Sequence, residues 1–327
     1  IYSIVDMLVE SQLLGETGAS GVSNGSQCIT LLTQVAIGLS NGGNILVGQY
    51  FGAKDQDNRE ETTGSFLALF AIVGAVVSVM VCLAAGPFMR LMGAPALEEA
   101  TDYLAAAGWG LFFVYGYNAL ASVLRAMGNS QTPMRCVMIS VAVNVGLDLL
   151  FVGPLGWGTA GAAWATVIAQ AVSFCMSVLF FTRFSCQQFR GVRADRATVG
   201  RILTLGLPTL VQMGSLSVVL VVMNGLLAPR AGTVGVAAFG YVSRLAEFAL
   251  APFSALCLAA APIIGSSYGA GLHSRVRQTV VRTVQLGLVY AVVAVAVCYA
   301  LSGALLGIFT RDPAICLLYT SPSPRDA

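Results

Sequence analysis

Apolar runs of about 20 residues recur along this chain, and most of its charged residues lie in short stretches between them. A helix of that length crosses the roughly 30 Å hydrocarbon core of a bilayer. Only 10% of the residues are charged and 57% are hydrophobic, whereas charged residues make up about 25% of a soluble domain. We therefore predict an all-α integral membrane protein that crosses the lipid bilayer many times.

The apolar runs predict nine membrane spans, of which the first is partial. Glycine and proline mark the connections, as in Gly153-Pro154. The predicted spans cover about residues 1–14, 27–50, 64–92, 102–127, 134–153, 159–182, 201–228, 234–265 and 279–309.

Positive charge alternates between the predicted loops. Every second loop is basic, whereas the other loops and the final turn hold only Arg90, Arg230 and Arg311. By the positive-inside rule the basic loops face the cytoplasm. This topology accounts for the basic loops, so we expect no nucleic-acid partner. The basic loops contain Lys54, Arg59, Arg125, Arg135, Arg183, Arg190, Arg193, Arg196, Arg201, Arg275, Arg277 and Arg282.

Both ends of the chain depart from the pattern of a complete membrane protein. It opens on Ile1 inside an apolar segment, without an initiator Met or a signal peptide. Its last twelve residues, CLLYTSPSPRDA at 316–327, resemble the translation of a sequencing-library adaptor. We exclude residues 316–327 from the fold and expect a fragment whose native sequence ends near Ile315.

An internal repeat relates the two parts of the chain. A shift of 217 residues, without gaps, lays GQYFGA (Gly48–Ala53) on GSSYGA (Gly265–Ala270) and Gly86 on Gly303. Each hexapeptide closes a span and precedes a charged cytoplasmic loop. Parallel repeats of this kind are typical of transporters in which two halves alternate access to a central site.

The repeat predicts two lobes of six helices each. Residues 1–190 would form the amino-terminal lobe, with its first helix incomplete, and residues 191–315 would form helices seven to nine of a partial carboxyl-terminal lobe. The full bundle would have twelve helices, so we expect about three to be missing, and we predict that the fragment alone does not transport.

One carboxylate lies within the fifth apolar run. Asp148 follows VMISVAV and precedes LLFVG, and Asn144 lies four residues upstream, on the same side of a helix. An ionisable group inside a membrane helix is costly and indicates an ion or proton pathway. The alternative is a protonated Asp that forms hydrogen bonds between helices.

Several segments together resemble the MATE family, the multidrug and toxic compound extrusion transporters. The sequence IYSIVDMLVESQLLG is similar to the first helix of the family, and GLSNGGNILVGQYFGA to the end of its second. NVGLDLLFVGPLGWGTAGAAWAT resembles helices five and six, and LGLPTLVQ the start of helix seven. The resemblance covers the chain from Ile1 to about Ile315.

The resemblance implies a V-shaped pair of lobes that exports amphipathic, often cationic, small molecules in exchange for Na+ or H+. It also implies a cation or proton site formed by Asp6, Asn144, Asp148 and Thr166, which match the family positions in residue type. Two carboxylates, an amide oxygen and a hydroxyl suit a hard cation or a shared proton. For Asn144 and Thr166 taken singly, interhelical hydrogen bonding is an equal alternative. We expect a multi-pass monomer in a bacterial plasma membrane.

The sequence departs from the family pattern at three places. Ser11 replaces a glycine of helix one. The adjacent Glu10 is an extra carboxylate, which could face the cavity as an accessory site residue or lie at the outer interface, the position that we favour. Ser217 stands where one branch of the family has a Glu. Arg244 and Glu247 lie three apart in the eighth span, where they could form a structural ion pair or, second, contact substrate.

The mechanism we expect is antiport, in which ion binding at Asp6 and Asp148 lowers substrate affinity in the outward-open state. A lipid-linked precursor flippase of the wider superfamily is an alternative, but it would need a strongly cationic cavity, and away from their ends the spans hold only Arg244. A structural membrane protein would leave the intramembrane carboxylates without a purpose.

An integral-membrane enzyme is a further, less favoured alternative, because no nucleophile, base or metal constellation is apparent. We expect no cofactor beyond H+ or Na+ and no other metal, because His273, the only histidine, falls in a polar loop. The cysteines show no spacing typical of metal ligands, and we interpret them as small packing residues. They are Cys28, Cys82, Cys136, Cys175, Cys186, Cys257, Cys298 and Cys316.

Overall fold

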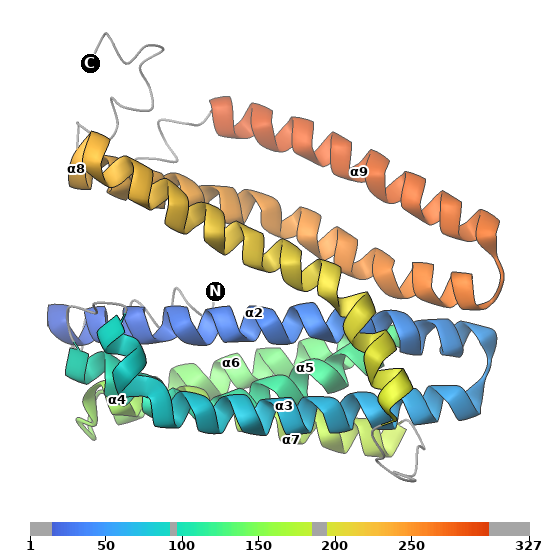
Figure 1. The fold of residues 1–327 in the computed structure, drawn as a ribbon, viewed down its shortest axis with the longest axis horizontal. Coiled ribbons are helices and arrows are strands. Elements are labelled where there is room, and N and C mark those ends of the chain that lie inside the picture. The colour runs from blue at the N-terminus through green and yellow to red at the C-terminus, as the bar shows by residue number, and fades with distance from the viewer. Residues whose placement is uncertain (1–14, 92–96, 185–194, 301–327) are drawn as a thin grey trace. The chain divides into compact units, whose positions relative to one another are not determined.

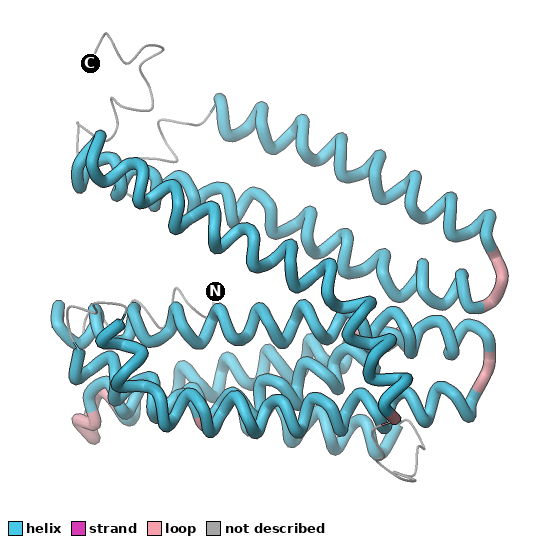
Figure 2. The backbone as a smooth tube through the Cα atoms, viewed as in Figure 1, coloured by secondary structure: helices cyan, strands magenta, loops and turns pink. Residues whose placement is uncertain are grey.

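The computed structural model describes residues 15–91, 97–184 and 195–300 of the chain. All regular secondary structure in these ranges is α-helical, which confirms the predicted fold class, and short loops join the helices (Figures 1 and 2). The first predicted span, 1–14, lies outside these ranges. In chain order the helices are α2 (Gly15–Ala53), α3 (Gln56–Leu91), α4 (Leu97–Gly108), α5 (Gly110–Ala126), α6 (Gln131–Phe151), α7 (Gly158–Phe184), α8 (Arg196–Gly269) and α9 (His273–Ala300).

The lengths and compositions of these helices confirm a multi-pass membrane protein. Within the described ranges, five helical segments are long and apolar enough to span a bilayer, and a sixth is added if α4 and α5 count as one bent span. The five are Gln56–Arg90, Gln131–Phe151, Gly158–Arg183, Ala249–Gly269 and His273–Cys298.

The structure differs from the predicted spans in three places. Helix α2 begins at Gly15 rather than near residue 27, and the predicted fourth span is broken at Trp109, where α4 and α5 meet at 45°. Helical backbone also continues through the predicted seventh and eighth spans as α8, whose ribbon turns back on itself between them (Figure 1). Apolar run length alone could not locate these bends, because helix breaks depend on contacts from other elements.

The chain divides by packing into two compact units, Ile1–Met213 and Gly214–Ala327. Unit 1 thus includes the first turns of α8. The sequence repeat predicts a different boundary, near residue 190, between the amino-terminal and carboxyl-terminal lobes. That lobe boundary stays a prediction. In unit 1, α6 packs on α7, and α5 packs on α2, α3 and α7.

Two hydrophobic clusters form the core of unit 1. One surrounds Met89, Tyr103 and Leu111 near the N-terminal end of α2. The other surrounds Phe66 and Tyr115 toward the C-terminal end of α2. The phenol of Tyr115 also donates to the carbonyl oxygen of Leu32 at 3.1 Å. Helix α5 contributes to both clusters and therefore lies at the centre of the unit.

A close helix crossing fixes the first turns of α8 against α2 within unit 1. A Cβ atom placed on Gly42 would lie 2.8 Å from the amide nitrogen of Gly206 and closer still to the carbonyl oxygen of Ile202. A Cβ on Gly38 would meet the Cα of Leu210 at 3.0 Å. The two backbones therefore touch, as at other small-residue crossings of membrane helices.

The ends of α2 and α8 share their turn geometry at the predicted shift of 217 residues. Lys54 has a φ of +57° and Gly271, its counterpart, a φ of +71°. Asp55 N–H donates to the Tyr50 carbonyl at 3.1 Å, and Leu272 N–H donates to the Ser267 carbonyl at 2.9 Å. Equivalent hydrogen bonds close both helices, which supports the repeat inferred from GQYFGA and GSSYGA.

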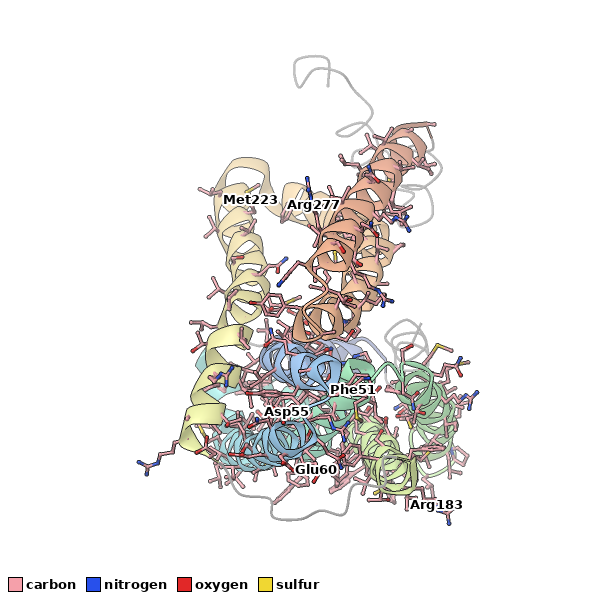
Figure 3. All side chains as sticks on the ribbon, turned by 90° about the vertical axis from the view of Figure 1, so that its right-hand side faces the viewer. Phe51, Asp55, Glu60, Arg183, Met223 and Arg277 are labelled. Atoms are coloured by element: carbon pink, nitrogen blue, oxygen red, sulfur yellow. The ribbon has the colours of Figure 1, made fainter. Side chains whose placement is uncertain are left out.

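Figure 3 views the end of unit 1 at which α2 turns into α3, marked by Phe51, Asp55, Glu60 and Arg183. Asp55 caps α3 there, because its Oδ1 accepts a hydrogen bond from the backbone N–H of Asn58 at 3.2 Å. The predicted orientation places this end of the unit in the cytoplasm.

Asp195 caps α8 on the same side of the membrane, and this cap should respond to acid. Its Oδ2 accepts a hydrogen bond from Thr198 N–H at 2.7 Å, and the hydrogen bonds from Thr198 lower the pKa of the carboxyl group. The cap is therefore fully formed above the ordinary carboxyl pKa of about 3.9 and is lost as the pH falls through the lowered value. We expect hydrogen-exchange protection of the Thr198 amide to fall over that range, and Asp195→Ala to remove the change. The same acid response in Asp195→Ala would contradict this origin.

Candidate functional site

A tight turn between α6 and α7 sets the geometry of the candidate site. Gly156 and Gly158 have φ values of +63° and +60°, a region that favours glycine. Trp157 N–H donates to the carbonyl of Phe151 at 2.9 Å, and the two rings pack at a tilt of 30° with centroids 4.8 Å apart. The turn therefore locks α6 and α7 into one antiparallel register.

That register brings together three of the four residues predicted to form the cation or proton site. Asn144 Nδ2 donates to Thr166 Oγ1 at 3.4 Å across the two helices. Asp148 follows one turn later on α6, on the same face as Asn144. The exposed fractions are 0% for Asn144, 2% for Asp148 and 8% for Thr166, so the set lies in the interior of unit 1.

The chemistry of the three residues fits a small cation or a proton. They place a carboxylate, an amide and a hydroxyl on adjoining helix faces within a membrane bundle. A carboxylate removed from water loses hydration and is stabilised by a cation or by protonation. Oxygen ligands of this kind suit hard cations, and the carboxylate alone suffices for a proton.

The other predicted residues stay predictions. Asp6 and Glu10 lie outside the described residues. Arg244 and Glu247 lie on α8, but their side chains are outside what the structure describes. Among the described residues, no group of three His, Cys, Asp or Glu side chains could hold a metal ion.

The sequence reasoning did not single out two features of unit 1. Asn44, within the quoted α2 motif, is buried, and both polar atoms of its amide have no hydrogen-bond partner among the described residues. The buried face of α6 extends the site, since it consists of Pro133, Cys136, Ser140, Asn144 and Asp148. The sequence does contain a signal for this face, because Ser140, Asn144 and Asp148 recur every four residues in an apolar run.

Comparisons with known proteins agree with this arrangement. A profile of the MatE family matches residues 1–150 and 208–320. The chain is 26% identical over 95% of its length to Bacillus subtilis YoeA, named a probable multidrug resistance protein, and covers 70% of that protein. It is 23% identical over 96% of its length to the multidrug export protein MepA of Staphylococcus saprophyticus, of which it covers 71%.

Solved structures show the same fold. A MOP superfamily transporter from Pyrococcus furiosus superposes with a TM-score of 0.88 at 22% identity, over 96% of this chain and 71% of that one. An outward-facing multidrug resistance MATE transporter superposes with a TM-score of 0.86 at 22% identity, over 96% and 71% of the two chains. The family profile matches well over half of the residues, and the buried Asn144, Asp148 and Thr166 lie on adjoining helices of that fold. The chain therefore belongs to the MATE family.

Proposed function

We propose that the protein is a secondary antiporter that exports amphipathic or cationic small molecules, including drugs, in exchange for H+ or Na+. The observation that carries the proposal is the buried Asp148, one turn from an Asn144 that reaches Thr166 across the helix pair. Relatives named for multidrug resistance and export support the substrate class. We also propose that it acts as a monomer. We place it in the plasma membrane of a bacterium, because YoeA and MepA come from bacteria.

The carboxylate explains how one site could couple two fluxes. An ionised Asp148 is costly in a low-dielectric interior, and either a proton or a sodium ion removes that cost. Coupling requires the ion and the substrate to favour different conformations or to compete for one site. In this proposal Asp6 supplies a second carboxylate, so that ion binding adjusts helix one beside the cavity.

No observation on the described residues favours an enzyme or a lipid flippase over an antiporter. The relatives are named for multidrug resistance and export, and a flippase for a phosphate-bearing lipid would need a cationic cavity. For the Pyrococcus furiosus transporter, a binding pocket of reversed polarity suggests a different function. Pocket polarity can therefore differ on this fold, and transport has to be measured on this chain.

Dye transport in everted vesicles tests the proposal. The complete reading frame that encodes this chain would be expressed in an efflux-deficient bacterium. Ethidium would be added outside the everted vesicles under an imposed H+ gradient, an imposed Na+ gradient or none. We expect one gradient to drive dye uptake and its collapse by a matching ionophore to stop it. Equal uptake under all three conditions would contradict antiport, and uptake of a fluorescent lipid instead of the dye would favour the flippase.

A further inference from the structure

A line of polar side chains continues from the candidate site along α6 and α7 of unit 1. Helix α5 closes part of this line, because a Cβ atom placed on Gly110 of α5 would clash with the Oε1 atom of Gln170. On α7 the polar positions recur at intervals of four, three and four residues, which places them on one helix face. Most of these side chains are buried. We call this set the polar seam; it comprises Ser140, Asn144 and Asp148 of α6 and Thr166, Gln170, Ser173 and Ser177 of α7.

Two hydrogen bonds fix the register of the polar seam. Asn144 Nδ2 reaches Thr166 Oγ1 at 3.4 Å, and one turn nearer the N-terminal end of α6, Ser140 Oγ donates to the carbonyl oxygen of Ala169 at 2.7 Å. In an antiparallel pair, this register places Ser177 level with the first turn of α6. At 1.5 Å per residue, successive polar side chains on each helix are separated by roughly 4.5–6 Å along the helix axis.

An ionisable group lies near the inner end of α6, level with the end of the seam. The phenol of Tyr117 on α5 donates to the Pro133 carbonyl oxygen at 3.1 Å, in the first turn of α6. Tyr117 also lies within electrostatic reach of Arg125. Arg125 lies in the last turn of α5, at the end that the positive-inside rule assigns to the cytoplasm. Polar groups therefore extend from Asp148 to the inner end of the helix pair.

Two polar groups of the seam keep unused hydrogen-bonding capacity. Ser177 Oγ and Gln170 Oε1 are buried and have no hydrogen-bond partner among the described residues. Other buried serines of unit 1 find partners, as when Ser122 Oγ donates to the Ser40 carbonyl at 2.8 Å. Leaving a buried polar group unsatisfied is costly. Polar atoms one helical turn apart are spaced for single bridging water molecules, which would satisfy both groups.

We propose that the polar seam is a proton path between Asp148 and the cytoplasm, and that the proton is therefore the coupling ion. The inference rests on the proposed antiport. Asp148 gives its proton to a neighbouring oxygen, each hydroxyl or water accepts one proton and passes on another, and the last water releases it to the cytoplasm. No bond other than O–H forms or breaks, and Asp148 is left as the carboxylate.

The packing of the seam favours a proton over a sodium ion. Ala165 and Ala169, which flank the polar positions of α7, are fully buried at 0% exposure. A hard cation needs several oxygen ligands at each resting place, whereas a proton needs one hydroxyl or water per step. The hydroxyls would carry the proton, and the amides of Asn144 and Gln170 would hold the intervening waters.

Interhelical hydrogen bonding is the structural alternative, and it makes a different prediction for Ser177. Ser140 could serve that purpose, since its hydroxyl bonds to the opposite helix. Ser177 has no such bond among the described residues, so Ser177→Ala should leave the stability unchanged or increased. A loss of proton transfer without a loss of stability therefore indicates a relay.

The test measures proton release and stability in the same variants. The complete reading frame would be expressed in everted vesicles, with a pH-sensitive dye on the cytoplasmic face, and a stopped-flow pulse of ethidium would displace the proton. The variants are Ser177→Ala, Ser177→Thr and Gln170→Leu, with Ser122→Ala as a buried serine outside the seam. Thermal unfolding, ethidium affinity and the infrared carboxyl band that is lost in Asp148→Asn would be recorded for each.

We expect Ser177→Ala and Gln170→Leu to slow proton release by about tenfold or more, with dye affinity, the carboxyl band and the unfolding temperature retained. Ser177→Thr should restore release. Ser122→Ala should release protons at the wild-type rate, although it loses the hydrogen bond to the Ser40 carbonyl and with it some stability. Proton release at the wild-type rate in both Ser177→Ala and Gln170→Leu would overturn the proton path. Dye transport driven by Na+ alone would also overturn it, but would leave the antiport proposal intact. Dye transport driven by neither gradient would overturn the antiport proposal itself.

Discussion

Asp148→Asn is expected to abolish gradient-driven export while the protein still reaches the membrane and folds. Asparagine has nearly the same shape as the protonated carboxyl group, so the contacts around this buried position are retained. It cannot release a proton or bind a cation as a carboxylate does, so the ion no longer shifts the conformational equilibrium. We expect ethidium export under the driving gradient to fall by about tenfold or more, because the ionisable group itself is removed.

Measurements of abundance and pH dependence separate this effect from misfolding. Membrane abundance and the unfolding temperature should equal those of the wild type, because a costly buried charge is lost and no packing changes. Dye affinity, measured from pH 6 to pH 8, should lose any dependence on pH that the wild type shows in that interval. Asp57→Asn, an exposed carboxylate in the first turn of α3, is the matched control and should export normally. Normal export by Asp148→Asn would show that the carboxylate is not the coupling group.

Gly42→Ala is expected to destabilise unit 1 by about 3 kcal/mol or more, although it adds only one methyl group. The added Cβ would lie 2.8 Å from the Gly206 amide nitrogen and would clash with the carbonyl of Ile202. Both neighbours are backbone atoms, which cannot move aside by changing a rotamer. Helices α2 and α8 would have to separate, with loss of the contacts along the crossing. Thermal unfolding of the purified protein in detergent measures the effect.

Gly146→Ala is the matched control for Gly42→Ala. Gly146 also lies inside a helix, α6, but an added Cβ there would meet no atom within 4 Å. Alanine has the higher helix propensity, so Gly146→Ala should be neutral or stabilising by about 1 kcal/mol. Equal unfolding temperatures for the two variants would show that the crossing of α2 and α8 tolerates separation.

The crossing also bears on how transport would work. Because α8 begins on unit 1, the segment that leads into the second unit is held by backbone contact on α2. Arg201 strengthens this attachment, since its Nη1 donates to the phenol oxygen of Tyr50 at 2.9 Å and its guanidinium lies over the ring, 5.9 Å from the centroid. A substitution at Gly42 would therefore affect the base of α8 as well as the stability of unit 1.

The sequence by itself determined the membrane class, most of the helix positions and the shared face of Asn144 and Asp148. Each of these depends on a local property: run length against bilayer thickness, or the 3.6-residue helical period. The repeat was also visible locally, because GQYFGA and GSSYGA close helices in turns that need residues at positive φ, as found at Lys54 and Gly271.

Only the tertiary structure decided which side chains meet across helices. Two contacts join segments that are far apart in the sequence: the 3.4 Å contact of Asn144 with Thr166 and the touching backbones at Gly42. The break at Trp109 depends on packing from other elements. The polar seam has the same origin, since periodicity shows that Gln170 and Ser177 share a face of α7 but not which helix covers that face. Periodicity acts within one helix, whereas register and burial arise from the close packing of several.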